Sequence, residues 1–213
     1  MQKVINRIID AHGKIDVIIN NAGFDLYSSF EGTSDHEFRA QMETNFFGSL
    51  NVVRAVLPYM KTQRSGKIIN LSSIGGLMAI PYNSAYSASK FALEGFFESL
   101  RFELHRFNIH VVLIEPEAVK TTSLHQSIKT SDQETNDHKE IVNNLVKKMK
   151  EDGEKKGVST NAVVKVVIKA ASIEQPKLRY PVGGLVRFVP LMKLLFPQKL
   201  LFKFLYQRFI GSK

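Results

Sequence analysis

The chain has 213 residues, of which 44% are hydrophobic and 23% are charged, so it has enough apolar material for one core and too little length for two. It contains no Cys, which excludes disulfides, thiolate nucleophiles and Cys-ligated metals; its six His show no metal-binding spacing, and we expect no metal site. The formal net charge is +9, and much of the excess lies in residues 185–213, which carry six cations and no acid. No nucleic-acid-binding module accompanies this charge, so we expect no nucleic-acid partner.

Hydrophobic spacing predicts alternating helices and strands in the first half of the chain. The expected elements are a short helix ending near His12, a buried strand over 15–19, a long helix reaching about Thr62 and a buried strand over 66–71. A capping box formed by Thr33 or Ser34 with Glu37 would begin the long helix.

The second half continues the alternation. We expect a long helix over 84–108, a strand over 109–114, a solvated helix over 134–152, a helix over 161–172 capped by Ser159 or Thr160, and a short strand over 180–182. This order predicts an α/β layered fold with a mostly parallel sheet flanked by helices.

The most informative pair is Tyr86 and Lys90. Residues four apart on a helix share a face, which brings the phenol close to the ammonium. A nearby cation stabilises the phenolate, so we expect the pKa of Tyr86 to be lowered and the phenol to serve as a general acid or base. Ser73 lies in the loop after the preceding strand, and the loops at the carboxyl ends of parallel strands converge on one crevice.

At this point the sequence resembles the short-chain dehydrogenase/reductase family. The resemblance is carried by Asn-Asn-Ala-Gly at 20–23, Asn45, Ser73, Tyr86 with Lys90, and the segment at 114–121, and it covers about residues 2 to 184. It implies a partial Rossmann-like, doubly wound fold. The catalytic domain would be a truncated one over 1–184, and residues 185–213 would form a basic, apolar helical tail packed on that domain or on a membrane surface.

The resemblance also implies hydride transfer between NAD or NADP and an alcohol or ketone. Tyr86 would exchange a proton with the substrate oxygen, Lys90 would hold the nicotinamide ribose, Ser73 would position the substrate oxygen, and Asn45 would help to hold a relay water. The expected cofactor-binding residues are Asn21, Ala22, Gly23, Tyr86, Lys90, Pro116, Val119 and Thr121. The family tends to form dimers or tetramers, which implies a homo-oligomer.

Two departures from the family pattern stand out. The chain has no Thr-Gly-x-x-x-Gly-x-Gly turn, so we expect the adenosine-binding half to be absent, the sequence to be a shortened product, and a sheet edge with an apolar face to be left uncovered. Glu117 stands where the family most often has Gly, and its carboxylate would either crowd an anionic cofactor or point to solvent.

The tail leaves three interpretations open. Residues 185–210 interleave Leu and Phe with cations and are broken by Pro190 and Pro197, which suits ordinary packing or an oligomer contact, a membrane-surface segment, or a lid over a lipophilic steroid, retinoid or acyl substrate. The sequence has no signal peptide and no membrane-spanning stretch, so we expect a cytoplasmic protein, peripheral at the membrane in the second case. The leading hypothesis is an NAD(P)-dependent oxidoreductase, and the alternative is a non-catalytic remnant that serves as an interaction or membrane-surface protein.

Overall fold

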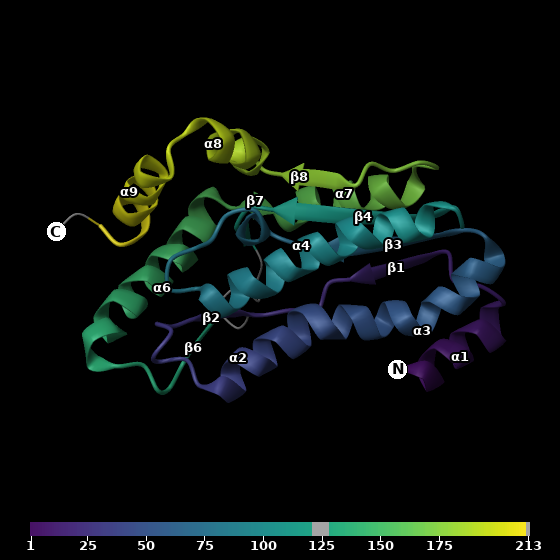
Figure 1. Ribbon diagram of the computed structural model, residues 1–213, viewed down its shortest axis with the longest axis horizontal. Helices are drawn as coiled ribbons and strands as arrows, with labels where there is room; N and C mark the ends of the chain where they lie inside the picture. Colours follow the sequence, from purple (N-terminus) through teal and green to yellow (C-terminus); the bar gives the residue numbers. More distant parts are fainter. Residues whose placement is uncertain (121–127, 212–213) are drawn as a thin grey trace.

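A four-stranded parallel sheet forms the centre of the molecule. The computed structural model describes residues 1–120 and 128–211. The strands β1 (Val17–Asn20), β3 (Gly66–Leu71), β4 (Ile109–Pro116) and β8 (Arg179–Val182) lie side by side in that order (Figure 1). The expected α/β fold with a parallel sheet is therefore confirmed.

Helices cover both faces of this sheet. On one face, Ile68, Val111 and Leu113 pack against α1 (Gln2–His12), α3 (Gly48–Gln63) and α4 (Ser84–His105). On the other face, Ile69, Val112 and Ile114 pack against α7 (Thr160–Ser172). Because successive strand residues point to opposite faces, a strand buried on both sides is a continuous apolar run, the pattern that Ile68–Ile69 and Val111–Ile114 show.

The long helix expected before residue 62 is present but interrupted. Ser34 caps α2 (Asp35–Met42) in a capping box with Glu37, which settles the choice between Thr33 and Ser34. A π-helical segment over Glu43–Phe47 then joins α2 to α3. Such wide turns occur frequently at functional sites, and this one contains Asn45.

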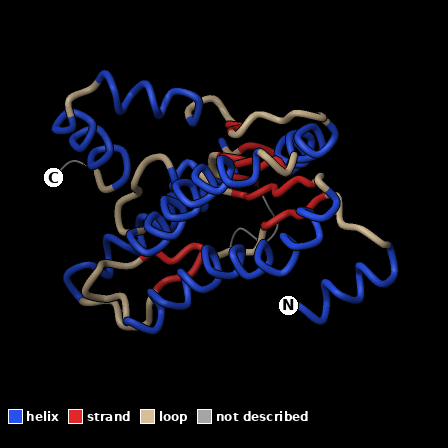
Figure 2. Tube along the Cα trace, turned by 45° about the vertical axis from the view of Figure 1, so that its right-hand side comes forward, coloured by secondary structure: helices blue, strands red, loops and turns tan. Residues whose placement is uncertain are grey.

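Two small parallel pairs were not expected from the sequence. Strand β2 (Asp25–Tyr27) pairs with β6 (Ile128–Thr130), and β5 (Val119–Lys120) pairs with β7 (Val158–Ser159). The first pair lies apart from the main sheet (Figure 2), on the side where α2 begins (Figure 1). Helix α6 (Asn136–Lys156) follows β6 and packs on Tyr27. Each of these strands is too short for a periodic pattern to develop, so pairing with a distant segment determines it.

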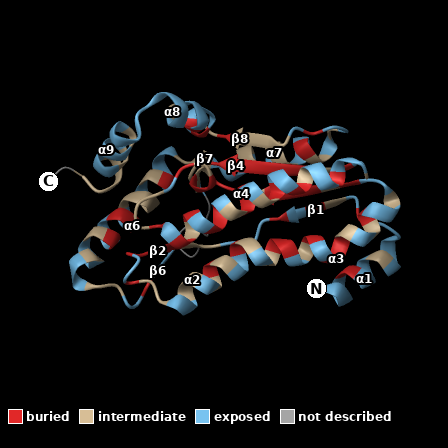
Figure 3. Ribbon diagram, viewed as in Figure 1, coloured by how far each residue is buried: buried red, intermediate tan, exposed pale blue. Residues whose placement is uncertain are grey.

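The tail folds into short helices, as the two prolines indicated. A 3-10 turn over Val186–Phe188 leads into α8 (Val189–Leu195) and α9 (Gln198–Phe209). Arg208 bonds Asp152 of α6 at 2.8 Å, which ties α9 to the body. Much of α8 and α9 is nevertheless exposed (Figure 3), and the exposed residues include large apolar side chains such as Leu194 and Phe202.

Strand β1 leaves an apolar sheet edge uncovered, as expected. Among the described residues, β1 pairs with β3 alone, and Ile19 is 51% exposed. Val164 and Ile168 of α7 are also exposed, and together with Ile19 they line one cavity. An edge strand with apolar neighbours is a site at which another chain segment can pair.

A charge cluster that includes the buried carboxylates of Glu94 and Glu115 ties β8 to α4 and β4. The guanidinium of Arg179 contacts the carboxylates of Glu94, Glu98 and Glu115, the last two at 2.6 and 3.2 Å. Burial, together with the neighbouring Glu94 carboxylate, raises the pKa of Glu115 to about 7, although Arg179 lowers it. Three carboxylates around one guanidinium therefore leave negative charge uncompensated.

We expect this cluster to make the fold less stable as the pH rises from about 4.5 to about 7. The folded state holds the proton of Glu115 over this interval while the unfolded state releases it, so the free energy of unfolding falls, by about 3 kcal/mol from this carboxyl. Urea unfolding of the wild type and Glu115→Gln at a series of pH values checks this, because the variant should show a smaller fall. Equal slopes for the two proteins would contradict the prediction.

Candidate active site

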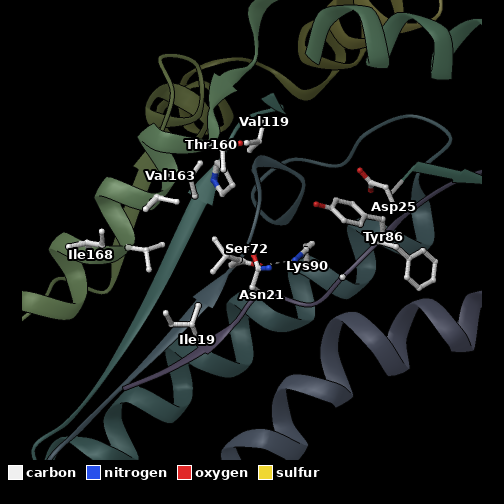
Figure 4. Close-up of a pocket in the computed structure, with 16 residues that line it drawn as sticks. Ile19, Asn21, Asp25, Ser72, Tyr86, Lys90, Val119, Thr160, Val163 and Ile168 are labelled. Atoms are coloured by element: carbon white, nitrogen blue, oxygen red, sulfur yellow. Dashed lines mark hydrogen bonds between the residues drawn. The ribbon is translucent and has the colours of Figure 1, made fainter. Parts of the chain in front are cut away.

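A cavity of about 850 Å³ opens at the carboxyl ends of β1, β3 and β4 (Figure 4). Parallel sheets place their ligand sites at this edge, because the loops that leave the strands meet there. The lining residues are Ile19, Asn21, Gly23, Phe24, Asp25, Leu71, Ser72, Tyr86, Lys90, Pro116, Val119, Thr160, Val163, Val164, Val167 and Ile168.

The cavity gathers most of the residues that the sequence assigned to cofactor binding. Asn21, Gly23, Pro116 and Val119 line it together with Tyr86 and Lys90. Ala22 is exposed and is not among the lining residues. Thr121 lies outside the described residues.

Lys90 is buried on α4 and its ammonium points toward the end of β3. Its Nζ donates to the carbonyl oxygen of Leu71 at 2.7 Å, the bond drawn dashed in Figure 4, and lies 5.7 Å from the centre of the Tyr86 ring. Burial lowers the pKa of Lys90 to about 8, against the opposing effect of Asp25 and Glu94. The phenol and ammonium therefore share one helix face, as their spacing predicted.

The expected lowering of the Tyr86 pKa was wrong. Burial and the neighbouring Asp25 carboxylate raise the pKa of Tyr86, and a side-chain hydrogen bond with Ser73 only partly opposes them. Burial disfavours the charged phenolate, and a nearby anion does the same. In this state of the site Tyr86 is a neutral phenol, which suits it to give a proton rather than to take one.

Ser73 is held beside Tyr86 by the loop after β3. Its Oγ accepts a hydrogen bond from the backbone N–H of Gly75 at 3.0 Å, which caps the 3-10 turn over Ile74–Gly76. Gly75 must be a glycine here, because a Cβ at this position would stand 2.9 Å from Cε1 of Tyr86. The two hydroxyl groups are thus brought together from a loop and a helix, as the sequence suggested.

Asn45 is fully engaged by the protein. Its Oδ1 accepts from the backbone N–H of Phe24 at 3.1 Å, and its Nδ2 donates to the Phe24 carbonyl at 3.0 Å and to Ser89 Oγ at 3.2 Å. A Cβ on Gly23 would come within 3.1 Å of Asn45 Oδ1. Asn45 therefore anchors the loop after β1, and its role in holding a water stays a prediction.

Glu117 was expected either to crowd an anionic cofactor or to point to solvent, but its carboxylate lies outside the cavity of about 850 Å³ and is bonded to the backbone. Its Oε1 accepts a hydrogen bond from the backbone N–H of Val186 at 2.8 Å. Gly183, at φ +127°, leaves room for this carboxylate, because a Cβ there would come within 2.4 Å of Glu117 Cδ. The side chain fastens the start of the tail, and no sequence pattern could show that these residues meet.

Sequence reasoning missed Asp25, which lines the cavity beside Tyr86 and Lys90. It lies in β2, a strand that the sequence did not predict, so nothing indicated which way its side chain would point. Burial raises the pKa of Asp25 to about 7, while Asn83 and Lys90 lower it. A carboxylate in this position changes the electrostatics of both neighbours.

A second, mainly apolar cavity of about 270 Å³ lies under the tail. Met192, Phe204, Leu205 and other tail residues line it, opposite Ile74, Met78 and Ile80 of the loop after β3. That loop also packs on the Tyr86 ring through Gly75, so the apolar cavity and the phenol share a wall.

Known proteins resemble this chain over most of its length. The family model described as short chain dehydrogenase matches residues 1–133. A 3-ketodihydrosphingosine reductase of Bacteroides thetaiotaomicron is 38% identical over 189 residues, which are 88% of this chain and 70% of that protein.

Two solved structures extend the likeness to three dimensions. A short-chain dehydrogenase from Streptomyces avermitilis superposes with a TM-score of 0.77 at 27% identity, over 97% of this chain and 73% of its own. A metagenomic short-chain oxidoreductase in complex with NADP gives a TM-score of 0.52 at 31% identity, over 54% of this chain and 52% of its own. With the site geometry and the family match in agreement, the chain belongs to the short-chain dehydrogenase family of oxidoreductases.

Proposed function

We propose that this chain transfers a hydride between NAD or NADP and a lipophilic alcohol or ketone. The observation that carries the proposal is the arrangement of Tyr86, Ser73 and Lys90, in which a phenol stands on one helix face with a buried ammonium and lies close enough to the Ser73 hydroxyl for that group to lower its pKa. A carbonyl oxygen that accepts from both hydroxyl groups would be polarised and positioned for protonation.

The cavity suits the nicotinamide end of such a cofactor. Lys90 has three N–H donors, and Leu71 is the single acceptor found for them in the part of the chain that the structure describes, so donors remain for a ribose hydroxyl. Asn21 and Gly23 line the same wall. A similar solved oxidoreductase is described as a complex with NADP. When bound, the nicotinamide supplies or accepts the hydride.

The residues of the chain itself handle the proton and the position of the substrate. A neutral Tyr86 can donate its proton to the oxygen of a ketone, and Ser73 can hold that oxygen through its own hydroxyl. Lys90, anchored on Leu71, supplies a fixed positive charge close to the phenol as it loses its proton.

The apolar cavity under the tail supports a lipophilic substrate. Its walls are mainly Ile, Leu, Met, Val and Phe side chains, and it borders the loop that packs on Tyr86. Burying a hydrocarbon chain there contributes about 25 cal/mol for each Å² removed from water. The reductase of Bacteroides thetaiotaomicron is named for such a ketone, 3-ketodihydrosphingosine.

Fluorescence titration with NADH and NADPH tests the proposal, followed by assays of nucleotide oxidation with 3-ketodihydrosphingosine. We expect saturable binding by the wild type. The affinity should weaken at least about 10-fold in Lys90→Met, because methionine has no ammonium that could contact the ribose. Lys61→Met, on an exposed part of α3, is the matched control and should bind like the wild type. Absence of nucleotide binding by the wild type would instead favour a non-catalytic protein.

We also propose that the tail places the chain at an anionic membrane surface. No helix among the described residues is long and apolar enough to cross a bilayer. Leu194, Leu195, Phe202 and Phe204 are exposed on α8 and α9, and cations accompany them without any acid in residues 185–213. Exposed apolar side chains with nearby cations suit the interface of an anionic bilayer.

Co-sedimentation with vesicles checks the tail proposal. Vesicles that contain about 30% phosphatidylserine should retain the wild type, because each basic residue near an anionic surface contributes about 1 kcal/mol, and should release it as salt is raised. Leu194→Ser with Phe202→Ser should reduce retention several-fold, whereas Phe30→Ser, an exposed phenylalanine far along the chain from the tail, should not. Equal retention by both variants would count against this surface.

A further inference from the structure

Asp25 is a carboxylate on the wall of the reaction cavity that the mechanism above does not use. It is half-buried in β2 and lines the cavity with Tyr86 and Lys90 (Figure 4). Placing a carboxylate in a low-dielectric site costs free energy unless cations or several donors compensate it. The protein would not be expected to keep such a group there without a partner.

The partners that the fold provides are weak. Asn83 Nδ2 donates to Asp25 Oδ1 at 3.4 Å, beyond the usual N–H···O range, and also donates to the Leu26 carbonyl at the shorter distance of 3.0 Å. The ammonium of Lys90 bonds Leu71 instead. Within residues 1–120 and 128–211, Asn83 provides the one hydrogen bond found for the Asp25 carboxylate, so acceptor positions on it remain open.

The local electrostatics agree with this geometry. Burial outweighs Asn83 and Lys90 and brings the pKa of Asp25 to about 7. The same carboxylate raises the pKa values of Tyr27 and Tyr86, so its charge acts on the groups around it. A second cation in the cavity would relieve the cost of keeping Asp25 ionised.

We propose that Asp25 recognises a protonated amine, and that the substrate is a lipophilic ketone or alcohol with a primary amine close to the reacting carbon. The inference rests on the proposed function, because it locates the amine relative to Tyr86. Asp25 and Tyr86 line the same cavity and the carboxylate acts on the phenol, so an ammonium bound to Asp25 would hold the rest of the substrate in the cavity that Tyr86 faces. A primary ammonium offers three donors, which suits a carboxylate with open acceptor positions.

Matched substrates test the inference. 3-Ketodihydrosphingosine carries an amine beside its ketone, and an analogue with hydrogen in place of the amino group is its neutral partner. We expect the wild type to prefer the amino ketone at least 10-fold in kcat/KM and Asp25→Asn to turn over the two ketones with equal kcat/KM. Because Asp25 also acts on Tyr86 and Lys90, any change in the chemical step affects both ketones alike, and the ratio of the two kcat/KM values is the readout. Asp10→Asn, an exposed carboxylate on α1, makes the same charge change and should leave the preference intact.

Binding of small ligands gives a readout that does not require turnover. Calorimetric titration with octylamine and octanol should show at least 10-fold tighter binding of the amine to the wild type and equal binding of the two to Asp25→Asn. If neither ketone is reduced but octylamine binds through Asp25, the proposed function fails and the amine site stands. Equal affinities for amine and alcohol in the wild type would overturn the inference, and so would an effect of Asp25→Asn confined to NADP affinity.

Discussion

Replacing Tyr86 with Phe is expected to lower kcat for ketone reduction about 10²–10⁴-fold, the usual contribution of a positioned proton donor. Tyr86 lines the cavity with Lys90, and the Ser73 hydroxyl acts on its phenol. The substitution removes the phenol hydroxyl and keeps the ring that packs against Gly75. Steady-state oxidation of NADPH with 3-ketodihydrosphingosine measures the effect.

Because the substitution removes a proton donor and leaves the binding groups in place, it should lower kcat and leave KM almost unchanged. The substrate and the nucleotide can still bind in Tyr86→Phe, so KM and the affinity for NADPH should change little. Tyr59→Phe is the matched control. The hydroxyl of Tyr59 in α3 donates to Asn6 in α1, and Tyr59 does not line the cavity. Retention of most activity by Tyr86→Phe would require another proton donor and would contradict the assignment.

Replacing Arg179 with Met is expected to lower the free energy of unfolding by about 3–5 kcal/mol at pH 8. Arg179 contacts three carboxylates, of which Glu94 and Glu115 are buried, and the substitution leaves both without their cation. Each uncompensated buried charge costs free energy because water no longer solvates it. Urea unfolding followed by circular dichroism measures the loss.

A second substitution separates charge from packing. Adding Glu115→Gln to Arg179→Met should recover part of the lost stability, because it removes one of the stranded charges. The loss in Arg179→Met should also shrink below the raised pKa of Glu115, at about 7, where that carboxyl is protonated in the folded state. A loss independent of pH and of Glu115 would mean that the packing of the arginine stem, rather than charge, is what matters.

The main layers of this fold could be predicted from the sequence because each depends on local patterning. The β-branched runs around Ile68 and Val112 are buried on both faces of the sheet, the run around Ile18 is buried on one face, and the apolar stripe of α4 packs on the face that holds Ile18 and Ile68. Ser34 with Glu37 likewise marks the start of α2 through contacts three residues apart. In the same way, the four-residue spacing of Tyr86 and Lys90 places their side chains on one helix face.

Tertiary contacts decided the remaining features, since they join segments far apart in the chain. Pairing with β6 creates β2 and thereby brings Asp25 to the cavity. Burial of the phenol, together with the Asp25 charge, raises the pKa of Tyr86 instead of lowering it. The hydrogen bond between Glu117 and Val186 at the start of the tail likewise joins two segments that are far apart in the sequence. The sequence by itself determined the main helices, the buried strands and the placement of Tyr86 and Lys90 on one helix face, because short-range spacing encodes them. Only the folded chain decided the electrostatic environment of Tyr86, because a pKa depends on burial and on every nearby charge, however distant in sequence.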